Sequence, residues 1–453
     1  MQKFRELAEE AIEKSEGDFS EIHLSNTLSS TIVQAGLFSN NNGPVQHFSG
    51  TARVFVDGRW GLYQFDSPRQ MNHALDKAAS LAIHSNSPKI SFPKVPVACR
   101  DTYSSDDVGI PLSDVSLREK TFICRHYCDL MGASLPNGSA KISYSELIKD
   151  KVIVNSTGTS IREIENLGSL KKQGRLPSGV STTEEMAVRG TFDRFKGQEH
   201  HIEELGKALL QRDTSTNIAS GVYRVILDPE LTGILVHEAF GHLVEASFLG
   251  QNPVMAHLLR QGAKVGAECV NIIDDTLRMS YPGSMKWDDE GTPCEKTQLI
   301  TAGKITSWLH TMETASQFGT INTGNARISS IGRTPEARMT CTYMEPGKTP
   351  LDQLFSSLDD GLYLKGFMGG ATDMDRFSIT ASEAWIVKKG IITVPVTPVV
   401  ISGKVADILK SITNVCDDLL LKGSIAGCSK RGGKPIPVTY GGPHILIPKM
   451  QVS

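Results

Sequence analysis

The first half of the chain combines two hydrophobic periodicities. Apolar residues recur at helical spacing from Phe4 to Ile12, and the same spacing predicts helices over residues 71–85, 116–131 and 200–214. Alternating apolar and polar residues predict strands over 21–36 and most of 141–195, and a hairpin over 49–65 that turns at Asp57-Gly58. Helices mixed with antiparallel meanders predict an α+β fold.

A change of pattern near residues 215–220 predicts a boundary between an N-terminal α+β domain (1–218) and a C-terminal β-rich domain (219–453). After a predicted strand at 221–229, residues 230–250 form a strongly apolar helical pattern. Short strand patterns between glycine- and proline-containing turns then predict a long antiparallel sheet or a partial barrel. A late helix is predicted over 404–419, and the prolines of 427–448 predict loop and edge strand.

The apolar helical segment contains the stretch "VHEAFGHLVEASF", residues 236–248. The zinc-hydrolase motif H-E-x-x-H places its two histidines four residues apart, one helical turn, so that both face one metal ion. Here His237 and His242 are five residues apart. On a regular helix their side chains diverge by about 140°. A shared metal site therefore requires an irregular backbone.

Two interpretations of this stretch remain open. In the first, a π-bulge beside Gly241 absorbs the extra residue and brings His242 back towards His237. Glu238 then lies beside both histidines as a general base. In the second, the helix is regular, and Glu238, His242 and Glu245 share one face as a buried polar network. The apolar flanks favour a metal, because buried imidazoles need partners.

Two histidines leave a zinc ion short of a third protein ligand. Glu245 is the local candidate. Among the eight cysteines, Cys428 is the most suggestive, because it lies on a glycine-flanked turn close to Lys430 and Arg431. Positive charge of this kind favours the thiolate form of cysteine.

Other candidate sites have simpler structural interpretations. Cys124 and Cys128 share one face of a predicted helix and lack a second pair, so we expect them to pack in the core. The acidic segment 287–297, "WDDEGTPCEKT", could bind a cation, but we expect a solvated hairpin loop. The chain has no G-x-x-x-x-G-K-[ST] motif, no G-x-S-x-G elbow and no G-x-G-x-x-G opening a helix.

The composition narrows the possible partners. The 453-residue chain carries 47 basic and 50 acidic residues, a net charge of −3, and has no basic block. We therefore expect no nucleic-acid or membrane partner. The N-terminal segment lacks the apolar core of a signal peptide, and no apolar run is long enough to span a membrane. Together with eight scattered cysteines, this predicts a reduced, cytoplasmic protein.

Seven segments occur in an order that resembles the TldD/PmbA family, whose members are often labelled modulators of DNA gyrase. They are HEAFGHLVEASF (237–248), DDEGTP (288–293), TGNAR (323–327), ARMTCTYMEPG (337–347), GFMGGATD (366–373), ISGKVADILKSI (401–412) and GCSKRGGKPIPV (427–438). The resemblance covers essentially the whole chain and is strongest from Leu227 onwards. Only the TldD-like kind keeps H-E-x-x-x-H, so the chain resembles the catalytic kind.

The resemblance implies a zinc metallopeptidase that hydrolyses unfolded polypeptides or peptides. Residue by residue, His237 and His242 match the family's metal ligands, Cys428 its third ligand, and Glu238 the base that activates water. It also implies a dimer, either a heterodimer with a PmbA-like relative or a homodimer. The strand-rich second half offers an edge where an extended peptide could bind through its backbone.

The chain departs from the family pattern at two places. Ala246 and Ser247 follow Glu245 where an acidic residue is expected, and the loop at Cys428 reads Cys-Ser-Lys-Arg-Gly-Gly instead of a Cys-Gly-Lys type. Both departures concern substrate preference and partner choice, since neither removes an expected ligand. Two alternative functions remain open at this point: a zinc amidase on small molecules, and a non-catalytic peptide-binding or scaffold subunit.

Overall fold

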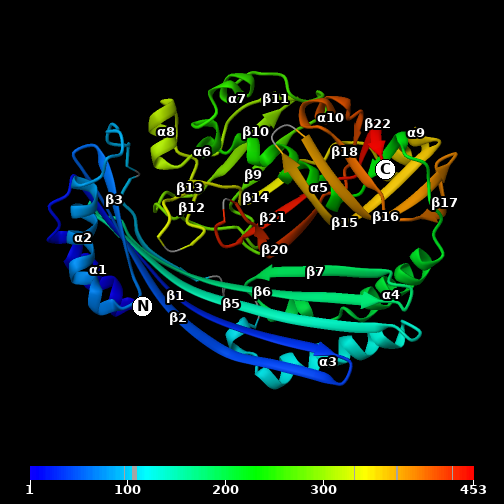
Figure 1. Ribbon diagram of the computed structural model, residues 1–453, viewed down its shortest axis with the longest axis horizontal. Coiled ribbons are helices and arrows are strands. Elements are labelled where there is room, and N and C mark those ends of the chain that lie inside the picture. Colours follow the sequence, from blue (N-terminus) through cyan, green and yellow to red (C-terminus); the bar gives the residue numbers. More distant parts are fainter. Residues whose placement is uncertain (96, 105–109, 331, 374–375, 431) are drawn as a thin grey trace.

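The computed structural model describes residues 1–95, 97–104, 110–330, 332–373, 376–430 and 432–453. The fold is α+β, as predicted. The first half of the chain builds a long curved sheet, and the second half builds a barrel and a further sheet that lie against its concave side (Figure 1). The domain boundary after residue 218 remains a prediction.

The N-terminal sheet has the strand order β3-β2-β1-β5-β6-β4, and β7 pairs with β6 on the same side as β4. Its strands are β1 (Phe19–Ala35), β2 (Phe38–Val56), β3 (Arg59–Phe65), β4 (Arg100–Ser104), β5 (Ser139–Asn155), β6 (Ser160–Arg175) and β7 (Ser181–Arg189). The predicted hairpin turn at Asp57-Gly58 is confirmed, with both residues at positive φ (46° and 79°). Such a turn matches the twist of the flanking strands.

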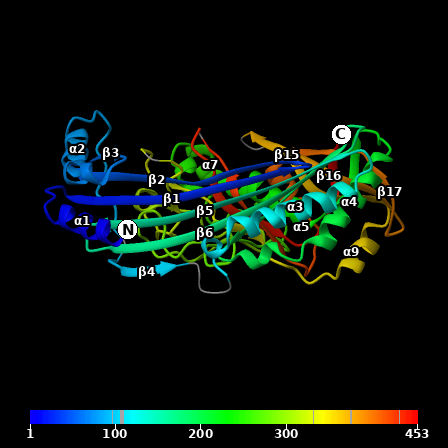
Figure 2. The ribbon, with the colours of Figure 1, turned by 90° about the horizontal axis from the view of Figure 1, so that it is seen from below.

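Four helices pack at the two ends of this sheet, as Figure 2 shows. Helices α1 (Gln2–Glu13) and α2 (Met71–Ile83) cover one end, and α3 (Leu117–Ala133) and α4 (Glu199–Asp213) cover the other. Cys124 and Cys128 of α3 are buried among the apolar side chains that α3 and α4 pack against the sheet. The prediction that these two cysteines pack in the core is confirmed.

The predicted barrel is closed rather than partial. Strands pair in the ring β15-β8-β22-β18-β16, and β16 returns to pair with β15. Closure removes the exposed edges that an open sheet would leave. The ring strands are β8 (Gly221–Leu227), β15 (Gly361–Asp373), β16 (Arg376–Lys388), β18 (Val400–Lys404) and β22 (Ile445–Val452), with β17 (Ile391–Val396) and β19 (Asn414–Val415) attached.

A six-stranded sheet lies beside the barrel, in the order β11-β10-β9-β14-β21-β20. Its strands are β9 (Ile272–Asp275), β10 (Lys296–Thr301), β11 (Lys304–Ile305), β14 (Cys341–Met344), β20 (Leu420–Cys428) and β21 (Ile436–Gly442), and β12 (Ala326–Arg327) pairs with β13 (Glu336–Ala337). The expected C-terminal edge strand is wrong, because β21 pairs on both sides. Pro437 fits there because it lies opposite the bulge in β20 and before the residues of β21 that pair with β14, so its missing N–H leaves no ladder bond unmade.

The remaining helices are short, and most of them connect strands of the second half. They are α5 (Pro229–Ile234), α6 (Ala246–Leu249), α7 (Pro253–Leu258), α8 (Met312–Phe318), α9 (Leu351–Leu358) and α10 (Val405–Ser411). The predicted late helix therefore ends at Ser411, well before residue 419, because the chain turns into β19. Among the described residues, no helix has the length and apolar character to cross a bilayer.

The expected solvated acidic loop is also wrong. Asp288 and Glu290 are 0% and 2% exposed, because the loop packs against the N-terminal sheet. Arg53 of β2 pairs with Glu290 at 3.1 Å, and Lys151 of β5 pairs with Asp289 at 3.4 Å. These partners lie far away in sequence, so the local acidity alone could not reveal the burial.

Candidate metal centre

The histidine-bearing segment begins at a well-capped helix. The backbone N–H of Leu231 donates to Asp228 (2.8 Å), and Pro229 occupies the first helical position of α5. After Ile234 the chain widens into a π-helical turn over Leu235–Phe240 and then tightens into a 3₁₀ turn over Gly241–Val244. The predicted bulge is confirmed, and the regular-helix interpretation is wrong.

Gly241 is needed for space rather than for backbone freedom. Its φ and ψ are −56° and −43°, which any residue adopts. A Cβ at this position, however, would lie 2.0 Å from Sδ of Met339. Met339 is 1% exposed, so it has little room to move away. Glycine is therefore required here because two segments approach each other closely.

The π turn brings His237 and His242 together. Their ring centroids lie 5.1 Å apart with the planes at 80°. Nε2 of His242 lies 3.5 Å from Sγ of Cys428. One donor atom from each of the three residues lies within 4.8 Å of the others, which is close enough for a single ion to draw them together.

His237 is buried without any hydrogen-bond partner. The residue is 2% exposed, and neither of its ring nitrogens makes a hydrogen bond within the described part of the chain. Buried polar groups of folded proteins are nearly always paired, because an unpaired one costs about 1–3 kcal/mol. A bound metal would give this imidazole the partner that the protein does not supply.

Cys428 lies at the end of β20, where a bulge between Ser424 and Cys428 interrupts the pairing with β21. Burial raises the pKa of its thiol, but the charges of His237 and His242 outweigh burial and lower the pKa to about 4. Arg338 donates from Nη2 to the sulfur at 3.0 Å. The side chain is therefore held as a thiolate, the form that binds zinc.

Glu245 is not the third ligand of this group but a partner of it. It is fully buried, and its Oε1 lies 3.2 Å from Nδ1 of His242, the nitrogen that faces away from Cys428. Lys430 and Arg338 also pair with its carboxylate. Burial lowers the pKa of His242, yet the neighbouring Glu245 raises it to about 10. Of the two cations expected near the thiol, Arg431 lies outside the described residues.

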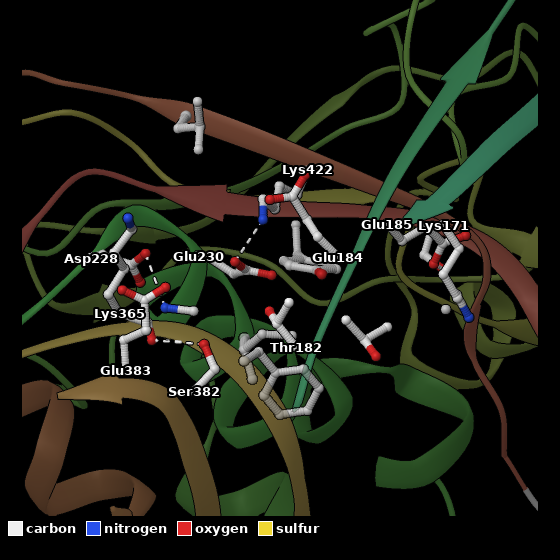
Figure 3. Close-up of a pocket in the computed structure, with 18 of the residues that line it drawn as sticks. Lys171, Thr182, Glu184, Glu185, Asp228, Glu230, Lys365, Ser382, Glu383 and Lys422 are labelled. Atoms are coloured by element: carbon white, nitrogen blue, oxygen red, sulfur yellow. Dashed lines mark hydrogen bonds and ion pairs between the residues drawn. The ribbon is translucent and has the colours of Figure 1, made fainter. Parts of the chain in front are cut away.

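Glu238 lines a cavity of about 670 Å³ that lies between the two halves of the chain. His237 and Glu238 line it together with residues of β7, α4, β15, β16, β20 and β21. Figure 3 shows charged side chains around this space, including the ion pair between Lys422 and Glu230 (2.6 Å) and Glu184 of β7. The wall of the cavity therefore carries both a carboxylate and an imidazole.

Tyr440 of β21 also lines the cavity. Its ring packs edge-on against His237, with centroids 6.3 Å apart. Burial, followed by the charges of Glu230 and Glu185, raises the pKa of its hydroxyl above the ordinary value. The side chain is therefore a protonated donor beside the candidate centre.

The structure brings together His237, His242 and Cys428, and Glu238 lines the cavity together with His237. Sequence reasoning missed Arg338 and Tyr440. Both belong to segments quoted for the family resemblance or next to one, but no local spacing links either residue to the histidines. Only the sheet that joins β14, β21 and β20 carries them to the site.

Comparisons with known proteins identify the family of the chain. Residues 220–453 match the PmbA/TldA metallopeptidase C-terminal domain. A metalloprotease of Synechocystis is 31% identical over 406 residues, covering 88% of this chain and 86% of that protein. A metalloprotease of Methanocaldococcus jannaschii is 30% identical over 446 residues, covering 94% and 95%. A protein of Saccharolobus solfataricus named zinc metalloprotease TldD homolog is 32% identical over 255 residues, covering 56% of each.

Solved structures share the whole fold. A candidate DNA gyrase modulator from Thermotoga maritima matches with a TM-score of 0.80 and 20% identity, over 100% of both chains. TldE from Thermococcus kodakarensis matches with a TM-score of 0.76 and 18% identity, over 100% of this chain and 99% of the other. Together with the family match over the C-terminal half and the two metalloproteases aligned over most of their length, this shows that the chain belongs to the PmbA/TldD family and is a metallopeptidase.

Proposed function

We propose that the protein hydrolyses peptide bonds of unfolded polypeptides or peptides with the help of a zinc ion held by His237, His242 and Cys428. The observation that carries this proposal is the unpartnered, buried imidazole of His237 beside a thiolate and a second imidazole. Two imidazoles and a thiolate are a donor set that suits zinc, and three protein ligands leave a position for water. One relative is named a zinc metalloprotease, which adds support.

When bound, zinc would polarise the substrate carbonyl and lower the pKa of a water towards ~7. Glu238 lines the cavity next to His237, so its carboxylate can accept a proton from the attacking water. The water oxygen then bonds to the carbonyl carbon. Glu238 returns the proton to the amide nitrogen as the C–N bond breaks. Each proton that Glu238 accepts is thus delivered to the leaving amine.

Glu245 and Arg338 hold the proposed ligands His242 and Cys428 in position. Glu245 accepts from Nδ1 of His242 and so leaves Nε2 facing the thiolate. Partners of this kind orient ligand imidazoles and raise their basicity. Arg338 contacts both the Cys428 sulfur and Glu245, and it holds the two side chains in one arrangement.

The cavity supports an extended chain as substrate. Its volume of about 670 Å³ suits a few residues and excludes a folded domain. Residues of β7 and β20, which are edge strands of their sheets, line the same space, and an edge strand can bind an extended peptide through its backbone, largely independently of sequence. We therefore propose unfolded polypeptides, rather than small amides, as substrates.

We also propose that the protein works as a dimer, with either a PmbA-like relative or a second copy of itself. The match to TldE over the full chain supports this pairing, since related folds offer related surfaces. Sedimentation of the protein alone and with such a relative distinguishes the two arrangements. A monomer under both conditions contradicts the proposal.

The decisive experiment compares the zinc-loaded protein with its Glu238→Gln variant. We expect near-stoichiometric zinc in both proteins, and a fall in kcat of about 10²–10⁴-fold in the variant on an unfolded polypeptide. Glu313→Gln, at an exposed position of α8, is the matched control and should cleave normally. Normal cleavage by Glu238→Gln, or a wild-type protein without zinc, contradicts the proposed function.

A further inference from the structure

The position of Tyr440 is fixed from two sides. Strand β21 lies between β14 and β20, so its backbone cannot shift sideways. Helix α5 approaches the next residue very closely: a Cβ at Gly233 would lie 2.4 Å from the backbone nitrogen of Gly441. The ring of Tyr440 packs at 64° to the imidazole of His237. The ring is therefore held at a defined place beside His237, and Tyr440 lines the same cavity as His237 and Glu238.

The hydroxyl of Tyr440 is free to act on a ligand. It makes no hydrogen bond to any residue that the structure describes. It is also absent from the fully buried polar atoms that lack a partner, so it keeps some exposure. Two other donors of the cavity are engaged by glutamates. Lys422 donates to Glu230 at 2.6 Å, and Ser424 donates to Glu185 at 2.9 Å. Tyr440 thus offers an unused donor next to the candidate centre.

Peptide hydrolysis needs such a donor. When the water oxygen bonds to the carbonyl carbon, the electron pair of the C=O bond moves to oxygen, which becomes an oxyanion. A preorganised hydrogen bond to that atom stabilises the transition state more than the ground state. We propose that Tyr440 donates this hydrogen bond. No proton leaves the phenol at any stage, and the proposal rests on the proposed function.

The test removes only the hydroxyl. Tyr440→Phe keeps the ring that packs on His237, so its zinc content should equal that of the wild type. We expect kcat on an unfolded polypeptide to fall by about 10²–10³-fold, the usual effect of losing one oxyanion donor, with KM changed by less than about 3-fold. Tyr223→Phe is the matched control, because its hydroxyl bonds to the carbonyl of Ala219 away from the cavity.

A second measurement does not depend on cleavage. A phosphinic peptide carries a tetrahedral, negatively charged group in place of the scissile bond, and such analogues bind far more tightly than substrates. We expect Tyr440→Phe to weaken its binding by about 10²-fold. In the Glu238→Gln background, Tyr440→Phe should leave the affinity for an ordinary peptide unchanged.

The outcomes separate the two proposals. If the wild type cleaves and Tyr440→Phe keeps both its kcat and its phosphinic-peptide affinity, Tyr440 is not the oxyanion donor, while the proposed function stands. If Tyr440→Phe loses zinc, the side chain serves packing of His237 and the inference is overturned. If the wild-type protein neither cleaves nor prefers the phosphinic peptide over an ordinary one, both proposals fail together.

Discussion

Two histidines of the second half are almost completely buried, at 2% exposure for His237 and 3% for His310. Their surroundings differ in chemistry. His237 faces a thiolate and another imidazole, and its ring nitrogens lack partners among the described residues. His310 packs near Trp308 and Phe318, with ring centroids 6.1 Å away in each case. Burial alone therefore does not make a histidine a candidate ligand.

His310 is a buried core histidine without a metal-binding neighbourhood. Its Nδ1 lies 3.3 Å from the hydroxyl of Thr314, and no acidic side chain pairs with it among the residues described. Burial lowers the pKa of His310 to about 4, so it stays neutral at physiological pH. The convergence of several donor atoms, rather than apolar flanks, distinguishes the surroundings of His237.

The largest expected effect comes from making the same substitution, histidine to glutamine, at His237 and at His310. His237→Gln should lose zinc and reduce cleavage by more than ~100-fold, because replacing even an outer partner of a ligand costs about 10–100-fold. His310→Gln should bind zinc stoichiometrically and cleave at the wild-type rate. Zinc analysis and peptide cleavage on both purified variants check this. Equal zinc content in the two variants would contradict the role of His237 as a zinc ligand.

The next effect concerns the partner of His242. Glu245→Gln removes the charge that faces Nδ1, and we expect the zinc affinity to fall by about 10–100-fold. Glu290→Gln is the matched control, since it also replaces a buried glutamate, but one that pairs with Arg53 and does not belong to the group of His237, His242 and Cys428. The control should lose stability and keep its zinc affinity. Competition with a chelator measures both, and an unchanged affinity in Glu245→Gln rules out the proposed orienting role.

The part of the site that lies in one stretch of sequence was predictable. His237, Glu238 and His242 stand within six residues, and their spacing required a bulge that the structure contains. Cys428 was predicted from its glycine-flanked, basic surroundings, with support from the family resemblance. The structure replaces that turn by a buried strand end, and Lys430 pairs with Glu245 instead of the sulfur.

The rest depends on contacts between distant segments. Arg338 reaches Cys428 across 90 residues, and Arg53 reaches Glu290 across 237. An acidic run such as 288–290 is solvated on most proteins, so its burial follows only from cations of another sheet. The closure of the barrel and the internal place of β21 are likewise pairing choices, which periodicity along one strand does not determine.

A smaller effect tests why the π turn needs its glycine. Gly241→Ala should destabilise the protein by about 1–3 kcal/mol, because the new methyl group would overlap with Met339. Gly43→Ala, where nothing lies within 4 Å, should be neutral. Urea unfolding of the metal-free proteins measures both. Adding Met339→Ala to Gly241→Ala should recover part of the loss; a neutral Gly241→Ala would show that the close approach is not required.

The smallest effect is a pH dependence that belongs to His310 alone. Because its pKa is about 4 when folded and near 6.5 when unfolded, the unfolded chain binds the proton more strongly. The stability associated with the neutral ring is therefore complete above pH ~6.5 and is lost as the pH falls towards 4. Between pH 7 and pH 5 we expect a loss of about 2 kcal/mol in the free energy of unfolding.

His310→Gln should lack this loss, whereas His84→Gln, at an exposed position, should retain it. All three proteins are measured without metal, so that the difference between the variants reports His310. Parallel pH profiles for wild type and His310→Gln would mean that its ring is already protonated or solvated, and the contrast between the two buried histidines would then disappear.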